Sequence, residues 1–582
     1  MKYFLTFSAL LFTIFVQAQQ LPPVFDAAVR YNNDNRIRKY ITPRRVVWQS
    51  DNSGQYIKDA SNLLKKGIGQ AELPQRNLCT LKSDAINKPG IILDFGKELQ
   101  GGLQLVTGMM KSHDPVRIRV RFGESVSEVM NDIDTVKGAT NDHALRDFYV
   151  SLPWLGVQEI GNSGFRFVRI DLADANTELH LKEASAIFVY RDIAYKGSFK
   201  CNDERLNKIW LTGAYTVHLN MQEYLWDGIK RGRLVWVGDM HPEVMTINSV
   251  FGYNDVVPKS LDAAKDQAPL PNWMNGISAY SMWWVLIQKD WYMYQGDKKY
   301  LDQQKDYLIK LLNLLMTKVD VNGKETLNGM RFLDWPSSEN PKAIHAGLQA
   351  MMIMTFDAGA QLCNILNDEA TAQKCKATTA KMKQYVPNAA NSKQAAALLT
   401  LSGQITPAQG NTLLSEDGAK NFSTFYGYYM LKAMAKAGNY KEAMNIMRTY
   451  WGAMLDMGAT TFWEDFNMDW LENASRIDEP VPVGKKDIHG DCGAYCYKGL
   501  RHSLCHGWAS GPTSWLTEQV LGVSVIEPGC KVIRIKPNLG DLQWVEGTFP
   551  TPYGIVNIKH KKLANGKIET KADGPKQVKI IL

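Results

Sequence analysis

The sequence lacks several features that mark common classes of protein. Beyond the first twenty residues, no apolar run is long enough to span a bilayer, and no dense Lys/Arg run with interleaved aromatic residues occurs. The formal net charge of +8 is small for a chain of 582 residues and 65.6 kDa. Repeats and low-complexity segments are not visible either. We therefore expect no nucleic-acid partner and no membrane-spanning segment in the mature chain.

Cysteine is scarce, with eight residues in the whole chain. In an exported protein these permit disulfides, and the pairs Cys363/Cys375 and Cys492/Cys496 are close enough in sequence to form them. The segment 489–508, "HGDCGAYCYKGLRHSLCHGW", gathers cysteines and histidines, but its spacings match no standard zinc finger. We predict no metal ion and no cofactor.

The first twenty residues, "MKYFLTFSALLFTIFVQAQQ", have the pattern of a cleaved secretory signal. A lysine precedes an apolar run from Tyr3 to Val16, and a small-residue site ends at Ala18. The sequence predicts a signal peptide over residues 1–18. Because no cysteine follows the cleavage site, we expect no lipid or other membrane anchor, and a soluble protein that is secreted or periplasmic.

The remaining chain changes its hydrophobic period twice. Residues 19–198 contain short alternating runs such as "VRIRVRF" at 116–122, which predict an antiparallel β-sandwich. Residues 199–522 have a helical period that begins at an Asp cap, and their length leaves room for about twelve helices. Residues 523–582 return to strands. The predicted fold is mainly α: an (α/α)6 toroid of six hairpins between an N-terminal β-sandwich and a small C-terminal β-domain.

Two clusters of polar and aromatic residues follow predicted helices. The first is "DGIKRGRLVWVGDMHPE", Asp227 to Glu243, and the second is "GATTFWEDF", in which Glu464 follows Trp463. In an α/α toroid the loops at one face line a central pocket, so both clusters are candidate site segments. The alternatives remain a solvated charged loop anchored by Trp236, and a structural Trp beside an acid at a helix end.

Taken together, these segments resemble the α-L-rhamnosidases of glycoside hydrolase family 78. The family pairs an early Asp with a run Glu-Arg-Leu-Gly-Trp-Thr-Gly-Asp, and here Asp227 is followed by "GRLVWVGD" at 232–239. "GATTFWE", "SLCHGWASG" and the run 522–544 resemble later family segments, and "SGFRFVRI" and "CNDERLNKIW" resemble the end of its sandwich and the start of its barrel. The resemblance covers nearly all of the mature chain and implies a six-hairpin glycosidase acting on an oligosaccharide or glycan.

The resemblance implies a role for individual residues. Glu464 falls on the general base that activates water in an inverting reaction. The other implied positions contact the sugar or form the walls of its pocket: Asp227, Trp236, Asp239, Trp335 and His506. Trp463 is a further candidate sugar contact, because an aromatic ring beside an acid can stack on a sugar face.

The chain departs from the family at Gly232, where the general acid falls. An inverting glycosidase needs one carboxylic acid and one carboxylate, and glycine supplies neither. General acid catalysis is typically worth about 10²–10⁴-fold in rate. Without a replacement for this group, the chain would be a feeble hydrolase.

Three interpretations remain open at this stage. In the first, a rhamnosidase-like hydrolase uses Glu243, His241 or another pocket acid in place of the missing one. In the second, a lyase releases L-rhamnose from O4 of a glucuronate by β-elimination, with a uronate-containing substrate held by Lys230, Arg231 and Arg233. In the third, the protein binds sugar without catalysis.

Overall fold

Long antiparallel strands form the N-terminal part of the chain, as the alternating pattern predicts. The computed structural model describes residues 34–133, 141 and 143–582, so the predicted signal peptide lies outside the described residues. A nine-stranded sheet has the order β3-β4-β9-β5-β8-β6-β7, with β1 on β9 and β2 on β5. Its strands are β1 (Arg36–Ile41), β2 (Arg45–Gln49), β3 (Ile57–Lys58), β4 (Cys79–Lys82), β5 (Gly90–Thr107), β6 (Val116–Gly123), β7 (Asp147–Leu152), β8 (Gly156–Leu172) and β9 (Glu178–Arg191).

The alternation in β6 explains why this sheet folds over a core of its own. Val116, Ile118 and Val120 are buried on one face of the strand, while Arg117 between them is exposed. The buried residues join a hydrophobic cluster with residues of β5, β8 and β9. One short helix, α2 (Val126–Met130), follows β6 and begins at Ser125, whose hydroxyl accepts a hydrogen bond from the Glu128 amide.

Residues 199–522 form twelve helices, α3 to α14, and the structure describes all of this range. The first is α3 (Glu204–Asn220), which begins at the predicted cap, because the Asp203 carboxylate accepts the amides of Arg205 and Leu206. The others are α4 (Met240–Val250), α5 (Val256–Gln267), α6 (Ser278–Gln295), α7 (Lys298–Met316), α8 (Pro341–Ile365), α9 (Glu369–Met382), α10 (Lys393–Ser402), α11 (Pro407–Ser415), α12 (Gly427–Lys436), α13 (Tyr440–Asp456) and α14 (Gly511–Trp515).

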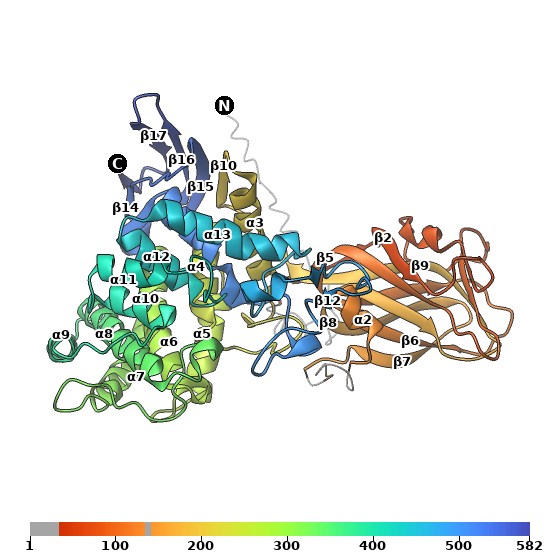
Figure 1. The fold of residues 1–582 in the computed structure, drawn as a ribbon, viewed down its shortest axis with the longest axis horizontal. Helices are drawn as coiled ribbons and strands as arrows, with labels where there is room; N and C mark the ends of the chain where they lie inside the picture. Colours follow the sequence, from red (N-terminus) through yellow and green to blue (C-terminus); the bar gives the residue numbers. More distant parts are fainter. Residues whose placement is uncertain (1–33, 134–140, 142) are drawn as a thin grey trace, which may run out of the picture. The chain divides into compact units, whose positions relative to one another are not determined.

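The even-numbered helices close a ring. Helix α4 contacts α6, α6 contacts α8, and so on through α10, α12 and α14, which contacts α4 again. Figure 1 shows α4, α6, α10 and α12 among the helices of this part of the chain. The ring is the inner layer of six helical hairpins, so the predicted toroid is confirmed. No helix among the described residues is long and apolar enough to cross a membrane.

The C-terminal residues form two small sheets, and one of them recruits a strand that the sequence did not predict there. The three-stranded sheet has the order β13-β14-β18, and the four-stranded sheet has the order β10-β15-β16-β17. Strand β10 precedes the barrel and pairs antiparallel with β15. Its four residues are too few to reveal their partner from sequence. The strands are β10 (Ser198–Cys201), β13 (Val523–Glu527), β14 (Val532–Ile535), β15 (Trp544–Thr551), β16 (Gly554–Lys562), β17 (Ile568–Asp573) and β18 (Lys579–Ile581).

The structure corrects the expectation of disulfides. All eight cysteines are free thiols. Cys363 on α8 and Cys375 on α9 are fully buried in the hydrophobic core of the barrel. Closeness in sequence does not align the two side chains as a disulfide requires.

Candidate active site

Three loop segments meet around Asp227 through main-chain hydrogen bonds. Asp227 lies between α3 and α4, and its carbonyl accepts the Gly507 amide at 2.8 Å. The Glu464 amide donates to the Ser503 carbonyl at 2.9 Å, and the His506 amide donates to the Phe462 carbonyl at 2.9 Å. These bonds bring together two predicted clusters that are separated by more than 200 residues in the sequence.

Asp239 and His506 form a buried pair at the start of α4. His506 Nε2 lies 3.1 Å from Oδ2 of Asp239, and the Tyr280 hydroxyl donates to Oδ1 at 3.0 Å. Burial lowers the pKa of His506, but the charge of Glu464 and the bond to Asp239 outweigh it and raise that pKa. An imidazolium beside a carboxylate offers both a donor and an acceptor to sugar hydroxyls. The predicted sugar contacts Asp239 and His506 therefore lie together.

Glu464 is ion-paired with Arg231, which also donates to it. Burial raises the pKa of the Glu464 carboxyl, but the charges of Arg231 and His506 lower it to about 2. The second oxygen, Oε2, accepts only a long hydrogen bond of 3.3 Å from the Ser503 amide. Glu464 is thus a carboxylate at any physiological pH, with one oxygen weakly engaged.

The carboxyl of Asp227 occupies the space beside Gly232 where a side chain would otherwise lie. The glycine has a φ of +79°, and a Cβ atom added there would lie 1.8 Å from Oδ2 of Asp227. The same carboxyl accepts the Leu234 amide at 3.0 Å through Oδ1, which fixes its position against the turn. Among the described residues, Oδ2 of Asp227 accepts no hydrogen bond from a side chain or an amide. The Asp227 carboxyl therefore occupies the point where a side chain at position 232 would begin.

The environment of Asp227 favours its protonated form. Burial is the largest cause and raises its pKa to about 7, with the negative charges of Asp239 and Glu464 acting in the same direction and His506 opposing them. Asp227 and Glu464 are thus two buried carboxyls whose pKa values are pushed to opposite sides of the normal range. Such a separation is the pattern of an acid and a base in one site.

The two residues proposed from sequence as replacement acids are enclosed by other parts of the barrel. Glu243 and His241 lie on α4, all of whose residues are buried. Both carboxylate oxygens of Glu243 are enclosed and have no hydrogen-bond partner among the residues that the structure describes, and burial raises its pKa well above its usual value. His241 lies between the Tyr429 hydroxyl at 2.8 Å and Asp290 at 3.0 Å. The Glu243 carboxyl lies against Gly507, next to His506, and the charges of Asp239 and Asp227 contribute to its raised pKa, so Glu243 borders the site. His241 instead bonds to side chains of α12 and α6.

The basic residues around Gly232 also differ from the expected cationic clamp. The Lys230 side chain is fully buried, and its ammonium lies 3.3 Å from Glu124 and 3.1 Å from Glu128. The Arg233 guanidinium donates to the Asn162 carbonyl at 2.9 Å and lies 4.7 Å from the centre of the Trp226 ring. Arg231 alone of the three contacts a predicted catalytic residue. The structure therefore does not assemble Lys230, Arg231 and Arg233 into one anion-binding group.

The predicted aromatic residues have different environments. Trp236 is partly exposed and meets Tyr280 edge to face, with ring centres 6.1 Å apart. Trp335 is partly exposed and stacks on Tyr495 at 6.1 Å. Trp463 is only 1% exposed, and its indole N–H has no partner among the described residues. Trp236 and Trp335 can offer a face to a sugar, whereas Trp463 packs within the barrel.

Sequence reasoning missed two residues that hold the site. Tyr280 on α6 donates to Asp239, and the Trp508 indole donates to the Glu464 carbonyl at 2.8 Å. The Trp508 ring also contacts His506, with centres 4.5 Å apart. Tyr280 lies in the buried and largely apolar first half of α6, which gives no signal beyond burial. Trp508 stands in a segment already singled out, and its nearness to His506 was the available signal.

Two groups of described residues have ligand atoms spaced as a metal ion would need. Asp227, Asp239 and His506 form one, and Glu124, Glu128 and His489 form the other, with atoms within 4.8 Å of one another. In the second group the ammonium of Lys230 already supplies a positive charge among the three side chains. In the first, Asp239 and His506 bond each other directly. In both groups, contacts within the protein already balance part of the negative charge of the carboxylates.

A closed ring of helical hairpins with paired carboxyls at the loops is the architecture of the six-hairpin glycosidases. The model for the bacterial alpha-L-rhamnosidase 6 hairpin glycosidase domain matches residues 194–520. The models for the glycosyl hydrolase family 78 alpha-rhamnosidase N-terminal domain and the bacterial alpha-L-rhamnosidase C-terminal domain match residues 55–186 and 522–582. The chain belongs to the bacterial α-L-rhamnosidases of glycoside hydrolase family 78.

Solved structures share the fold. A family 78 rhamnosidase of Bacillus sp. GL1 has a TM-score of 0.71 at 20% identity, over 88% of this chain and 54% of its own. A rhamnose-bound rhamnosidase from Klebsiella oxytoca has a TM-score of 0.66 at 19% identity, over 85% of this chain and 98% of its own. An α-L-rhamnosidase from Aspergillus terreus has a TM-score of 0.67 at 21% identity, over 88% of this chain and 61% of its own. The chain thus spans about half the length of the Bacillus enzyme. A comparison with curated protein sequences finds no match.

Proposed function

We propose that the protein is an exported α-L-rhamnosidase that releases terminal L-rhamnose from a glycan by inverting hydrolysis. Glu464 is the general base. Asp227 takes the role of the general acid, because this chain has Gly232 where the family has its acidic residue. Family membership supports the reaction class. The observation that carries the assignment is the Asp227 carboxyl, which fills the space above Gly232 with a pKa raised to about 7.

The proposed reaction needs one proton donor and one proton acceptor on opposite faces of the sugar. Asp227, protonated on the free Oδ2, gives its proton to the leaving oxygen. Glu464 accepts a proton from water, and the bond between water oxygen and the anomeric carbon forms as the glycosidic bond breaks. Asp239, His506 and Trp236 hold the rhamnose, with hydroxyls bonded to the charged pair and one sugar face against the indole.

The placement of the basic residues supports hydrolysis over β-elimination. A lyase needs free cations to stabilise the uronate carboxylate as C5 loses its proton. Lys230 is occupied by Glu124 and Glu128, and Arg233 by Asn162 and Trp226. A protein that only binds sugar has no need for carboxyls with separated pKa values.

Product analysis distinguishes the three interpretations. We expect β-L-rhamnose as the first product in proton NMR of a rhamnosyl disaccharide digest, because inversion reverses the α configuration. An absorbance increase in the near ultraviolet on a glucuronate-linked substrate would indicate an unsaturated uronate and a lyase. Sugar binding without any product would indicate a binding protein. Either result would contradict the proposed hydrolase.

A further inference from the structure

His502, in the cysteine- and histidine-rich segment 489–508, lies beside the segment that carries the proposed base. Its side chain is buried, and its Nε2 accepts the main-chain amide of Asp465 at 2.9 Å. Asp465 directly follows Glu464, so the imidazole holds the peptide unit that joins the proposed base to the next residue. His502 belongs to neither of the two groups of described residues whose ligand atoms are spaced for a metal ion.

Hydrogen bonds hold this peptide unit at both of its polar ends. The Glu464 carbonyl accepts the Trp508 indole N–H at 2.8 Å and the Thr424 hydroxyl at 2.6 Å. The Asp465 amide, in the same unit, donates to His502. Because a peptide unit is planar, bonds at both ends fix its orientation. They also fix the direction in which the Glu464 side chain leaves the main chain.

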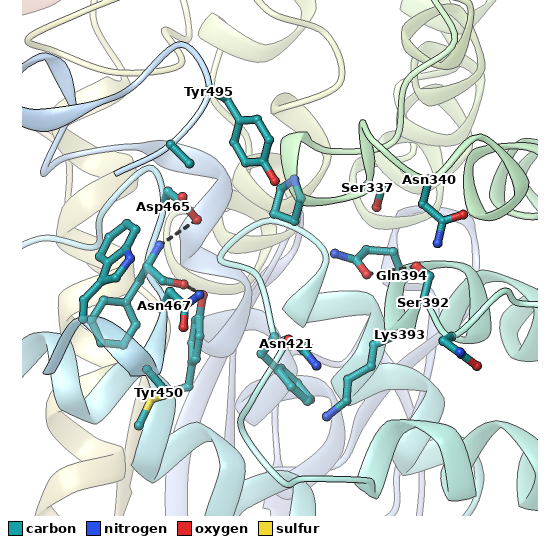
Figure 2. Close-up of a pocket in the computed structure, with 17 residues that line it drawn as sticks. Ser337, Asn340, Ser392, Lys393, Gln394, Asn421, Tyr450, Asp465, Asn467 and Tyr495 are labelled. Atoms are coloured by element: carbon teal, nitrogen blue, oxygen red, sulfur yellow. Dashed lines mark hydrogen bonds between the residues drawn. The ribbon is translucent and has the colours of Figure 1, made fainter. Parts of the chain in front are cut away.

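Open space borders the same segment. Asp465 and Asn467 line a pocket of about 360 Å³, and Figure 2 shows them across from Gln394. Among the described residues, the Asp465 carboxyl accepts only the Phe466 amide, at 2.8 Å, so it forms no bond across the pocket. Side chains on the other wall therefore do not hold the segment, and the bond from its amide to His502 supplies the support.

The surroundings of His502 keep its ring in one orientation. The rings of Trp463, Trp470 and Tyr497 lie around the imidazole, with centres 5.9 to 6.3 Å away. The His502 amide donates to the Gly499 carbonyl at 3.0 Å, which holds the main chain of the residue as well. The acceptor nitrogen therefore has a fixed place beside the base segment.

The imidazole also stays neutral. Burial is the largest cause and lowers the pKa of His502 well below its usual value. The positive charges of Lys230 and Arg231 act in the same direction, and the charge of Glu464 opposes them. A neutral ring carries one proton, and because Nε2 accepts the Asp465 amide, that proton is on Nδ1. Nε2 thus remains an acceptor at the pH of the reaction.

We propose that His502 is a positioning residue for the base: its imidazole holds the peptide unit between Glu464 and Asp465 so that the Glu464 carboxylate faces the attacking water. The proposal rests on the proposed function, because His502 acts only through Glu464 as the base. The acceptor at position 502 should then affect the rate of water attack and leave sugar binding unchanged, since other residues hold the rhamnose.

Two substitutions separate the acceptor from the packing. His502→Phe keeps an aromatic ring and removes the acceptor, whereas His502→Gln places an amide oxygen close to the position of Nε2. We expect His502→Phe to lower kcat about 10²-fold, the effect of displacing a catalytic group by about 1 Å, with KM unchanged. His502→Gln should recover most of this rate.

The substrate dependence identifies which catalytic group is displaced. The loss in His502→Phe should be the same on a rhamnosyl disaccharide and on 4-nitrophenyl α-L-rhamnoside, because water attacks the anomeric carbon in both reactions. A defect in the acid would instead spare the aryl rhamnoside, whose leaving group needs little protonation. Steady-state kinetics on both substrates, with calorimetry of L-rhamnose binding, measure these effects.

His560→Phe is the matched control. His560 is buried in β16, and its Nε2 lies 3.0 Å from the Leu521 carbonyl. Both phenylalanine variants remove a buried imidazole and should lower Tm, but only His502→Phe should lower kcat. If His502→Phe does not fold, His502→Asn makes the same comparison with His502→Gln, because its side chain is too short to reach the Asp465 amide.

The outcomes separate this proposal from the function on which it rests. Unchanged kcat in His502→Phe, a loss that lies in KM, a loss that spares the aryl rhamnoside, or an equal loss in His502→Gln would overturn the positioning role. Each of these results would leave the hydrolase intact. A wild-type protein that cleaves neither substrate, or a Glu464→Gln variant that keeps its turnover, would overturn the proposed function and the role of His502 with it.

Discussion

At the scale of single residues, the glycine at position 232 leaves no gap in the site. The Asp227 carboxyl lies where a side chain at position 232 would begin. The sequence shows the missing glutamate, but it cannot show which neighbour moves into its space, because the turn from Ile229 to Leu234 depends on two residues with positive φ, Gly232 and Arg233. Asp227 was predicted as a sugar contact, and its proposed catalytic role comes from the geometry.

The substitution Asp227→Asn should lower kcat/KM by an amount that depends on the leaving group of the substrate. Asp227→Asn keeps the shape and removes the transferable proton, so kcat/KM on a rhamnosyl disaccharide should fall about 10²–10⁴-fold. On 4-nitrophenyl α-L-rhamnoside, whose leaving group needs little protonation, the loss should be much smaller. Steady-state kinetics on both substrates measure the ratio, and an equal loss on the two would assign Asp227 to binding alone.

A side chain at position 232 should reduce activity. Gly232→Ala forces a Cβ to within 1.8 Å of Oδ2 of Asp227 and strains a backbone with a φ of +79°. We expect kcat/KM on the disaccharide to fall at least about tenfold as the carboxyl is displaced. Gly438→Ala is the control, since it has the same φ with no atom near its Cβ. Wild-type activity in the Gly232 variant would remove the link between the glycine and Asp227.

At the scale of elements, the loop before α4 is held by buried charges from the β-sandwich. Lys230 lies between Glu124 and Glu128, and Arg146 pairs with Glu128. The Leu504 amide donates to Glu124 at 2.6 Å, so the same cluster supports the segment that carries His506. Neither Glu124 nor Glu128 was singled out in the sequence, because a pairing across more than 100 residues leaves no local pattern.

Removal of the ammonium in this cluster should destabilise the protein. Lys230→Met leaves the glutamates without their shared cation, and breaking a buried ion pair typically costs about 3–5 kcal/mol. We expect a clearly lower Tm in thermal unfolding, and partial recovery in Lys230→Met/Glu124→Gln, which neutralises the glutamate that is not paired with Arg146. An unchanged Tm in the single variant would show that the cluster contributes little to folding.

At the scale of the whole molecule, hydrophobic period and length were sufficient to predict the six-hairpin barrel between two β-regions. The apolar faces of helices such as α7 and α13 repeat clearly along the chain, so each helix can be found locally. The pairing of β10 with β15 could not be found this way, because it joins segments about 345 residues apart. The free thiols and the position of Lys230 likewise depend on tertiary packing. Export remains a prediction from the N-terminal pattern.

The most direct test of the central claim is the pH dependence of kcat/KM on a rhamnosyl disaccharide. Asp227 must be protonated and its pKa is raised to about 7, whereas Glu464 must be ionised and its pKa is lowered to about 2. The rate should therefore be level in mild acid and fall about tenfold per unit above pH 7 as Asp227 loses its proton. Asp227→Asn should lack this fall. A wild-type rate that stays level or rises from pH 7 to pH 9, or an alkaline fall that persists in Asp227→Asn, would contradict the assignment of Asp227 as the acid.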